Sequence, residues 1–114
     1  MNYKEERPWG WFEILYEEKY LKIKRILVKP KNRLSLQSHT SRSENWTVIG
    51  GSALVQVDEK KIYLSTNQSV FIPAQSKHRV ENREDEDLIF VEVQTGTYLG
   101  EDDIVRYEDD YNRV

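Results

Sequence analysis

Residues 37–51 read QSHTSRSENWTVIGG and combine candidate metal ligands with the start of an apolar strand. Gln37 and His39 lie two positions apart, so in an extended segment their side chains point to the same face. Glu44 follows after a short loop, and the only other histidine of the chain is His78. Two imidazoles, one carboxylate and one amide oxygen suit a borderline divalent cation such as Zn²⁺, Mn²⁺, Fe²⁺, Co²⁺ or Ni²⁺. We therefore predict a mononuclear metal site if these four side chains converge, with Zn²⁺ slightly favoured.

On both sides of this stretch, apolar and polar residues alternate at a period of two, which predicts strands. The expected strands cover residues 21–28, 46–49, 52–57, 62–64, 70–72 and 88–94. Turn signals separate them, including Gly50-Gly51 and the polar run 58–61. Within residues 21–28 we expect Lys22 and Lys24 on a solvent-facing side, and a bulge where the apolar phase shifts. Strands at intervals of roughly ten residues, without a sustained helical period, predict an all-β sandwich or barrel.

Length and composition limit the possible classes of protein. At 114 residues and 13.6 kDa the chain has room for one domain, which we expect over residues 1–114. A net charge of −3 argues against binding nucleic acid through its phosphates. The absence of cysteine excludes disulfides and thiolate metal sites and favours a cytoplasmic location. No apolar run approaches the roughly 20 residues of a membrane span, and the first residues lack the apolar core of a signal peptide.

The order and spacing of Gln37, His39, Glu44 and Gly51 follow a known pattern. They resemble the first cupin motif, G-x5-H-x-H-x3-4-E-x6-G, with glutamine in its first histidine position. The second cupin motif, G-x5-P-x-G-x2-H-x3-N, is matched by Pro73, His78 and Asn82. The resemblance implies a cupin-type double-stranded β-helix, which is a jelly-roll barrel. It also implies that the metal ligands are Gln37, His39, Glu44 and His78.

Three glycine positions of these motifs are occupied by other residues, namely Lys31, Asn67 and Gln75. All three fall in expected turns, where glycine is usual because it adopts positive φ without steric cost. We therefore expect a backbone that is less free in φ at these turns, with the ligand set intact.

Longer stretches carry a more specific resemblance. They are Arg7–Gly10, Val28–Pro30, Arg33–Gln37, His39, Arg42, Glu44, Trp46, Ile72–Pro73, Lys77–Arg79, Glu81–Asn82, Glu92–Gly96, Tyr98–Arg106 and Asp109–Tyr111. They are similar to the type II mannose-6-phosphate isomerase domain, often the C-terminal part of bifunctional guanylyltransferase/isomerases. The acidic segment 100–111, which by composition alone indicates a solvated tail or short helix, is part of the domain by this resemblance. Ser41 and Asn45 depart from the family, which often has histidine there.

The family resemblance implies a metal-dependent isomerase that interconverts mannose 6-phosphate and fructose 6-phosphate for GDP-mannose and exopolysaccharide synthesis. The reaction moves a proton between C1 and C2 through an enediol, so it needs a Lewis acid for the oxyanion and a general base. The candidate bases are Glu101, Asp102, Asp103 and Lys77. The candidate phosphate-binding residues are Arg33, Arg42, Arg79 and Arg106. Arg42 and Arg106 are favoured because they lie within the motif stretches.

Two other interpretations remain open. The first is a non-catalytic cupin that binds a sugar or sugar phosphate and keeps its metal for structure; the small size and the non-histidine residues Ser41 and Asn45 favour it. The second is an Fe²⁺ cupin oxygenase, against which Gln37 and the C-terminal resemblance argue. Apolar residues on both faces of the strand at 89–93 need cover, so we expect a homodimer paired through its sheets.

Overall fold

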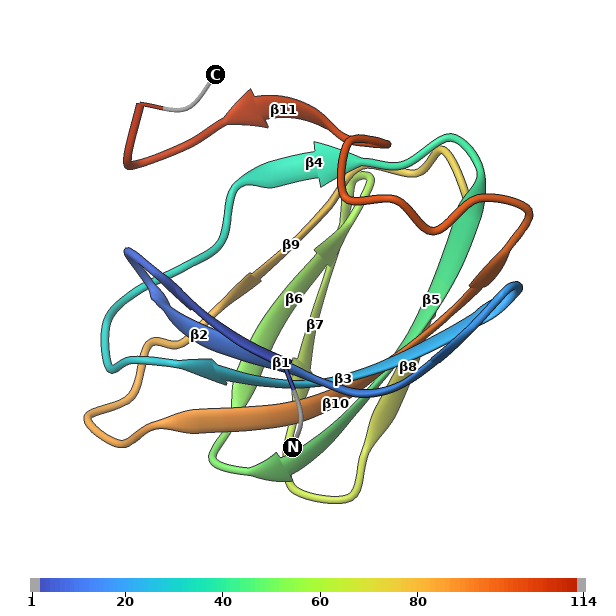
Figure 1. Ribbon diagram of the computed structural model, residues 1–114. Helices are drawn as coiled ribbons and strands as arrows, with labels where there is room; N and C mark the ends of the chain where they lie inside the picture. Colours follow the sequence, from blue (N-terminus) through green and yellow to red (C-terminus); the bar gives the residue numbers. More distant parts are fainter. Residues whose placement is uncertain (1–2, 113–114) are drawn as a thin grey trace.

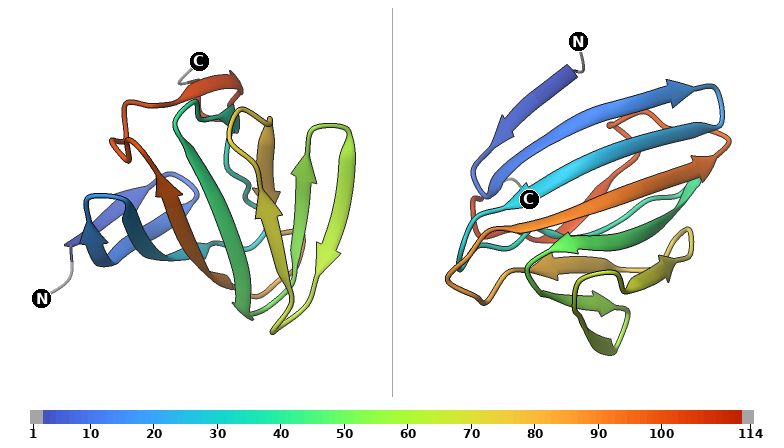
Figure 2. Two further views of the ribbon diagram at one scale, coloured as in Figure 1. Left: turned by 90° about the vertical axis from the view of Figure 1, so that its right-hand side faces the viewer. Right: turned by 90° about the horizontal axis from the view of Figure 1, so that it is seen from below.

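The computed structural model describes residues 3–112, which form eleven strands and their connecting loops (Figure 1). In chain order the strands are β1 (Tyr3–Arg7), β2 (Gly10–Glu18), β3 (Leu21–Val28), β4 (Leu36–Ser38), β5 (Arg42–Gly50), β6 (Ala53–Val57), β7 (Lys60–Leu64), β8 (Ser69–Ile72), β9 (His78–Glu81), β10 (Leu88–Gly96) and β11 (Val105–Glu108). A six-stranded sheet has the order β1-β2-β3-β10-β5-β8, and a five-stranded sheet has the order β11-β4-β9-β6-β7. Figure 2 shows the two sheets facing each other. The expected all-β barrel is confirmed.

Alternation in β10 and β5 explains how the two sheets share one core. In β10, Leu88 and Phe90 are buried, whereas Ile89 and Val91, which alternate with them, are only partly buried. Trp46 of β5 packs against Phe90, with ring centroids 5.2 Å apart. The inward side chains of both sheets thus form one apolar cluster, which also contains buried residues of β3, β6 and β9. Among residues 3–112, no helix is long and apolar enough to cross a membrane.

The inner face of β3 is more polar than its alternation suggests, and the expectation of solvent-facing Lys22 and Lys24 is wrong. Both side chains are buried and point inward with the apolar residues that follow them. Lys22 Nζ donates to the carbonyl of Leu99 over 2.9 Å, and Lys24 forms an ion pair with Glu101. β3 pairs with β10 in unbroken register, and the expected bulge lies in β2 instead. The Leu99 carbonyl and the Glu101 carboxylate therefore allow two charged lysines to occupy inward positions of β3, which are usually apolar.

The C-terminal segment belongs to the barrel, as the family resemblance implies. β11 pairs with β4, and Tyr111 packs against the core cluster. Asp110 accepts two hydrogen bonds from the guanidinium of Arg33, at 2.8 and 2.9 Å. The segment therefore covers the open edge of β4 (Figure 1).

The three turn positions that lack the motif glycine nevertheless have positive φ. The angles are 63° at Lys31, 73° at Asn67 and 71° at Gln75. A left-handed conformation costs a non-glycine residue about 1–2 kcal/mol, and asparagine tolerates it better than lysine or glutamine. The turns thus keep the backbone that glycine would favour and carry this cost locally.

Replacing Gln75 by glycine is expected to leave the free energy of unfolding unchanged or to raise it by about 1 kcal/mol, because the left-handed strain is relieved. Lys61→Gly is the matched control, since Lys61 lies in β7 and has no positive φ. The control should destabilise by about 0.5–1 kcal/mol. Urea titrations of both variants measure the difference, and equal losses in the two variants would contradict the strain argument.

Candidate metal centre

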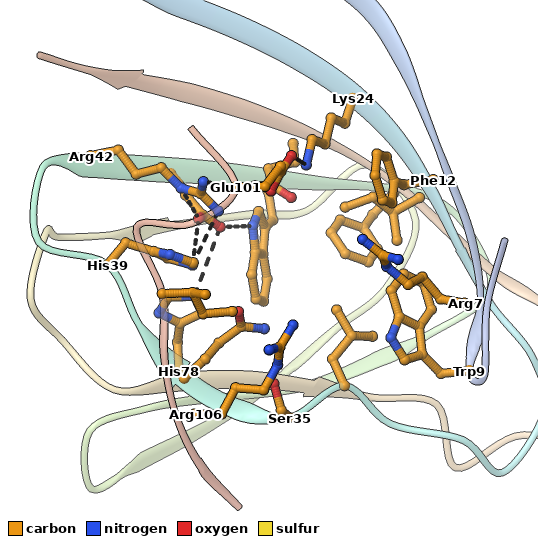
Figure 3. Close-up of a pocket in the computed structure, with 18 residues that line it drawn as sticks. Arg7, Trp9, Phe12, Lys24, Ser35, His39, Arg42, His78, Glu101 and Arg106 are labelled. Atoms are coloured by element: carbon orange, nitrogen blue, oxygen red, sulfur yellow. Dashed lines mark hydrogen bonds and ion pairs between the residues drawn. The ribbon is translucent and has the colours of Figure 1, made fainter. Parts of the chain in front are cut away.

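Four side chains predicted as ligands line one cavity of about 100 Å³ between the sheets (Figure 3). Gln37 is the central residue of β4, and His39 follows directly after that strand. Glu44 is an inward residue of β5, and His78 begins β9. Gln37 is the direct cross-strand partner of His78, so the two side chains share a face of the sheet. Paired strands β4 and β9 of one sheet and strand β5 of the other therefore bring the four residues together.

The distances between the donor atoms suit a single metal ion. His39 Nε2 lies 3.2 Å from Glu44 Oε2, and His78 Nε2 lies 3.9 Å from Glu44 Oε1. One ligand atom from each of these three residues lies within 4.8 Å of the others. Bonds of about 2.1 Å in a tetrahedral site separate ligand atoms by roughly 3.4 Å, so small side-chain movements would complete the geometry. The buried group of His39, Glu44 and His78 is thus able to hold a metal.

Both histidines present the correct nitrogen to this group. His39 Nδ1 bonds to the carbonyl of Asp103 over 2.6 Å, and His78 Nδ1 bonds to the carbonyl of Ser76 over 3.2 Å. A carbonyl oxygen only accepts, so each Nδ1 carries the hydrogen and each Nε2 presents its lone pair. Burial, assisted by the charge of Arg42, lowers the pKa of His39 to about 4, and burial also lowers the pKa of His78 to about 4. Neutral imidazoles at pH 7 are the form that binds metal.

Acidification is expected to destabilise the metal-free protein between pH 6.5 and about 4. In this range an unfolded histidine binds a proton that buried His39 and His78 do not take up. The two histidines therefore bind two more protons in the unfolded state than in the native state, which lowers the free energy of unfolding by roughly 3 kcal/mol each as the pH falls. Glu92, whose pKa burial raises to about 7, holds one proton in the native state over the same range and offsets roughly one histidine, so the expected net loss is roughly 3 kcal/mol. Urea titrations at pH 7 and pH 4.5 measure the loss. The variants His39→Gln and His78→Gln should flatten it; an unchanged slope in both would contradict the assignment.

Arg42 and Trp46 hold the Glu44 carboxylate in place. Arg42 Nε donates to Glu44 Oε2 over 2.9 Å, and Trp46 Nε1 donates to Glu44 Oε1 over 3.0 Å. Arg42 Nη2 also lies 3.1 Å from His39 Nε2. Both oxygens of Glu44 are therefore oriented by residues of its own strand, at i−2 and i+2.

Two further carboxyl groups line the cavity, and their pKa values are shifted in opposite directions. Burial and the nearby charge of Glu44 raise the pKa of Glu92 to about 7, and Glu92 Oε1 accepts from Gln94 Nε2 over 2.7 Å. Burial alone would raise the pKa of Glu101, but the attraction of Lys24 and the more distant Arg42 and Lys22 holds it below its usual value. Glu101 is therefore ionised at neutral pH, whereas a large fraction of Glu92 is protonated.

The structure divides the predicted arginines into two groups. Arg42 and Arg106 line the cavity, together with Arg7, which sequence reasoning did not select. Arg33 and Arg79 line a separate pocket, and they form ion pairs with Asp110 and Glu108. Their guanidinium groups serve to attach the C-terminal segment to the barrel.

Of the predicted bases, only one lines the cavity among the described residues. Glu101 lines the cavity, whereas Asp102 accepts a hydrogen bond from Tyr98 at the surface. Lys77 lies over the ring of Tyr107, 4.4 Å from its centroid. The carboxylate of Asp103 accepts the backbone N–H groups of Thr40 and Ser41. Asp103 thus fixes the loop that carries His39 through both its carboxylate and its carbonyl.

Sequence reasoning missed Glu92 and Lys24 as cavity residues. Glu92 occupies an inward position of β10, in phase with buried Leu88 and Phe90, and Lys24 is in phase with buried Ile26 in β3. A charged residue in phase with a strand's core positions was the available signal.

An antiparallel two-sheet barrel around a buried His–Glu–His group defines a cupin. The fold is similar to the crystal structure of the capsular polysaccharide assembling protein CapF from Staphylococcus aureus, with a TM-score of 0.83 and 19% identity over 95% of this chain and 34% of that one. The chain belongs to the family described as mannose-6-phosphate isomerase, C-terminal, which matches residues 1–109. The cupin fold and the family predicted from the sequence are both confirmed.

Curated relatives share this domain as a small part of longer proteins. The alginate biosynthesis protein AlgA of Pseudomonas aeruginosa is 48% identical over 108 residues, which are 95% of this chain and 22% of the relative. The xanthan biosynthesis protein XanB of Xanthomonas campestris pv. campestris is 46% identical over 95% of this chain and 23% of its own length. A mannose-1-phosphate guanylyltransferase of Escherichia coli is 42% identical over 94% and 23%, respectively. The chain thus spans less than a quarter of the length of these relatives.

Proposed function

We propose that this chain is a metal-dependent aldose–ketose isomerase that interconverts mannose 6-phosphate and fructose 6-phosphate. The observation that carries the proposal is one cavity in which buried His39, Glu44 and His78 face an ionised carboxylate, Glu101, beside cationic side chains. Membership of the mannose-6-phosphate isomerase C-terminal family over residues 1–109 supports the same substrate.

In the proposed site, Gln37, His39, Glu44 and His78 hold a divalent metal, with Zn²⁺ slightly favoured. When bound, the metal supplies a Lewis acid for the oxygens of C1 and C2. Glu101 is the general base that carries the proton between the two carbons, because it is ionised and lines the cavity.

The phosphate is assigned to the side of the cavity away from the ligand group. Arg7 lies across the cavity from His39 and His78, and Arg106 lies between these two sides (Figure 3). Guanidinium groups bind phosphate oxygens through paired, charge-assisted hydrogen bonds. A sugar phosphate with its reacting end at the ligand group would place its phosphate near Arg7 and Arg106, whereas Arg42 already contacts His39 and Glu44.

Formation of fructose 6-phosphate from mannose 6-phosphate tests the proposal. The chain is loaded with Zn²⁺, Co²⁺ or Mn²⁺ and compared with a chelated sample of the same preparation. Metal-dependent turnover is the expected result. Absence of turnover in protein whose metal content has been measured would overturn the isomerase assignment.

A second candidate function is a non-catalytic cupin that binds a sugar or sugar phosphate. Ser41 and Asn45 favour it, because they stand where the family often has histidine, a side chain able to transfer a proton. Saturable binding of fructose 6-phosphate without conversion, measured by calorimetry, would support this candidate over the isomerase.

We also propose that the chain forms a homodimer through the outer face of the six-stranded sheet. On this face, partly exposed Ile89 and Val93 of β10 lie opposite Leu27 and Ile23 of β3, which makes an apolar surface that only Arg25 interrupts along these two strands. Val93→Glu is expected to convert the dimer to a monomer in size-exclusion chromatography with light scattering. Thr95→Glu, an exposed position at the end of the same face, is the matched control. A wild-type chain that is monomeric at high concentration would contradict the pairing.

A further inference from the structure

Arg42 is a buried cation whose hydrogen bonds end on two candidate metal ligands. It begins β5, is 6% exposed, and lies within the cavity beside His39 (Figure 3). Nε donates to Glu44 Oε2 over 2.9 Å, and Nη2 lies 3.1 Å from His39 Nε2. The guanidinium therefore contacts the same atoms that would face a metal ion.

The bond to His39 and metal coordination exclude each other. His39 Nδ1 carries the hydrogen, because it bonds to the carbonyl of Asp103. His39 Nε2 then has one lone pair, which either accepts the hydrogen of Arg42 Nη2 or coordinates a metal. A metal ion and a guanidinium at hydrogen-bond distance from the same carboxylate also repel each other in a buried site.

The remaining nitrogen of Arg42 indicates where the guanidinium goes. Nη1 is buried and has no hydrogen-bond partner among residues 3–112, and it lies 3.9 Å from Glu101 Oε2. A small movement toward Glu101 would give Nη1 a charged acceptor while releasing His39 Nε2. Such a movement also brings the guanidinium closer to the carboxylate assigned as the base.

We propose that Arg42 is an internal cation that occupies the ligand group when no metal is bound and turns toward Glu101 when a metal binds. This inference rests on the proposed metal site and deepens it by naming what controls its affinity. In metal-free protein, Arg42 compensates the buried charge of Glu44. Arg42 also lowers the affinity of the ligand group for metal, because a bound metal must displace the guanidinium from His39.

The test compares metal binding by wild-type chain, Arg42→Gln and Arg7→Gln. Arg7 lines the same cavity, and its guanidinium contacts Glu5 and the ring of Phe12. The control therefore removes the same charge without touching the ligand group. Affinity for Zn²⁺ is measured by competition with a chromophoric chelator. Arg42→Gln is expected to bind Zn²⁺ at least tenfold more tightly than wild type, and Arg7→Gln within about twofold of wild type.

A measurement on the unmodified chain guards against misfolding of Arg42→Gln. Addition of Zn²⁺ to ¹⁵N-labelled wild-type protein should shift the side-chain resonances of Arg42 and leave those of Arg7 in place. If Zn²⁺ binds the wild type but Arg42→Gln binds equally or more weakly, or if the Arg42 resonances do not move, the inference is wrong and the isomerase proposal is unaffected. If the wild type and both variants bind no metal, the metal site itself is wrong and the proposed function falls with it.

Discussion

Replacing His78 by alanine is expected to lower metal affinity more than about 100-fold and to reduce isomerisation to the chelated background. His78 supplies one of the two imidazoles of the group, and its Nε2 faces Glu44 across 3.9 Å. Loss of a group that only orients a ligand already costs about 10–100-fold in affinity, so loss of a ligand itself costs more. Metal content after dialysis, measured by elemental analysis, and fructose 6-phosphate formation check the two parts of the prediction.

His78 also packs edge-on against Trp46, with ring centroids 5.6 Å apart, so alanine leaves a gap in the core. His78→Leu keeps most of the volume, offers no ligand atom, and so separates loss of a ligand from loss of packing. Lys77→Ala is the matched control, because the neighbouring Lys77 side chain lies over Tyr107 and outside the cavity. The ligand assignment would be refuted if His78→Leu kept both stoichiometric metal and turnover.

The convergence of the ligand group could be predicted because it depends on local geometry. Gln37 and His39 are two residues apart around the end of one strand, and Glu44 belongs to the inward alternation of the next strand with Arg42 and Trp46. These relations follow from the period of a β-strand. His78 is far away in sequence, and only the motif spacing from Pro73 connected it to the others.

The polar inner face of the barrel could not be predicted from alternation. Period-two patterns identify two faces but assign the apolar one to the core by default. In β3 the default fails, because Lys22 and Lys24 turn inward toward Leu99 and Glu101, about 77 positions later in the chain. Lys22 and Lys24 are in phase with buried Ile26, but the local pattern of β3 does not identify a partner that distant.

Short strands and paired arginines escaped sequence reasoning for a related reason. β4 has three residues and β9 reads His-Arg-Val-Glu, so neither has enough apolar positions to show a period. Arg79 lies next to His78 in β9, and adjacent residues of a strand point to opposite faces. Arg79 was predicted near the site because it adjoins His78 in the motif. In the strand its side chain points to the opposite face, where it binds Glu108.

Glu101→Gln is expected to lower kcat for isomerisation by about 10²–10⁴-fold, with metal content unchanged. Glutamine keeps the shape and hydrogen-bonding capacity of the side chain but does not accept a proton from carbon. Glu101 is suited to this role because Lys24 binds its carboxylate and keeps it ionised, against the effect of burial. Steady-state kinetics with both sugar phosphates, and exchange of the C2 proton with deuterated solvent, measure the loss. A base that acts only in the chemical step changes kcat much more than KM.

Asp102→Asn is the matched control for this variant. Asp102 adjoins Glu101 and carries the same group, but it does not line the cavity and accepts a hydrogen bond from Tyr98. The Asp102→Asn variant should keep nearly full isomerase turnover. The two carboxylates that line the cavity outside the ligand group are Glu92 and Glu101, so Glu92→Gln completes the comparison among the described residues. If Glu101→Gln stays active while Glu92→Gln loses solvent exchange, the proton is carried by the buried carboxyl group of β10. Glu101 would then act as the counter-ion of Lys24 and Arg42, and the reacting carbons would lie deeper between the sheets than proposed.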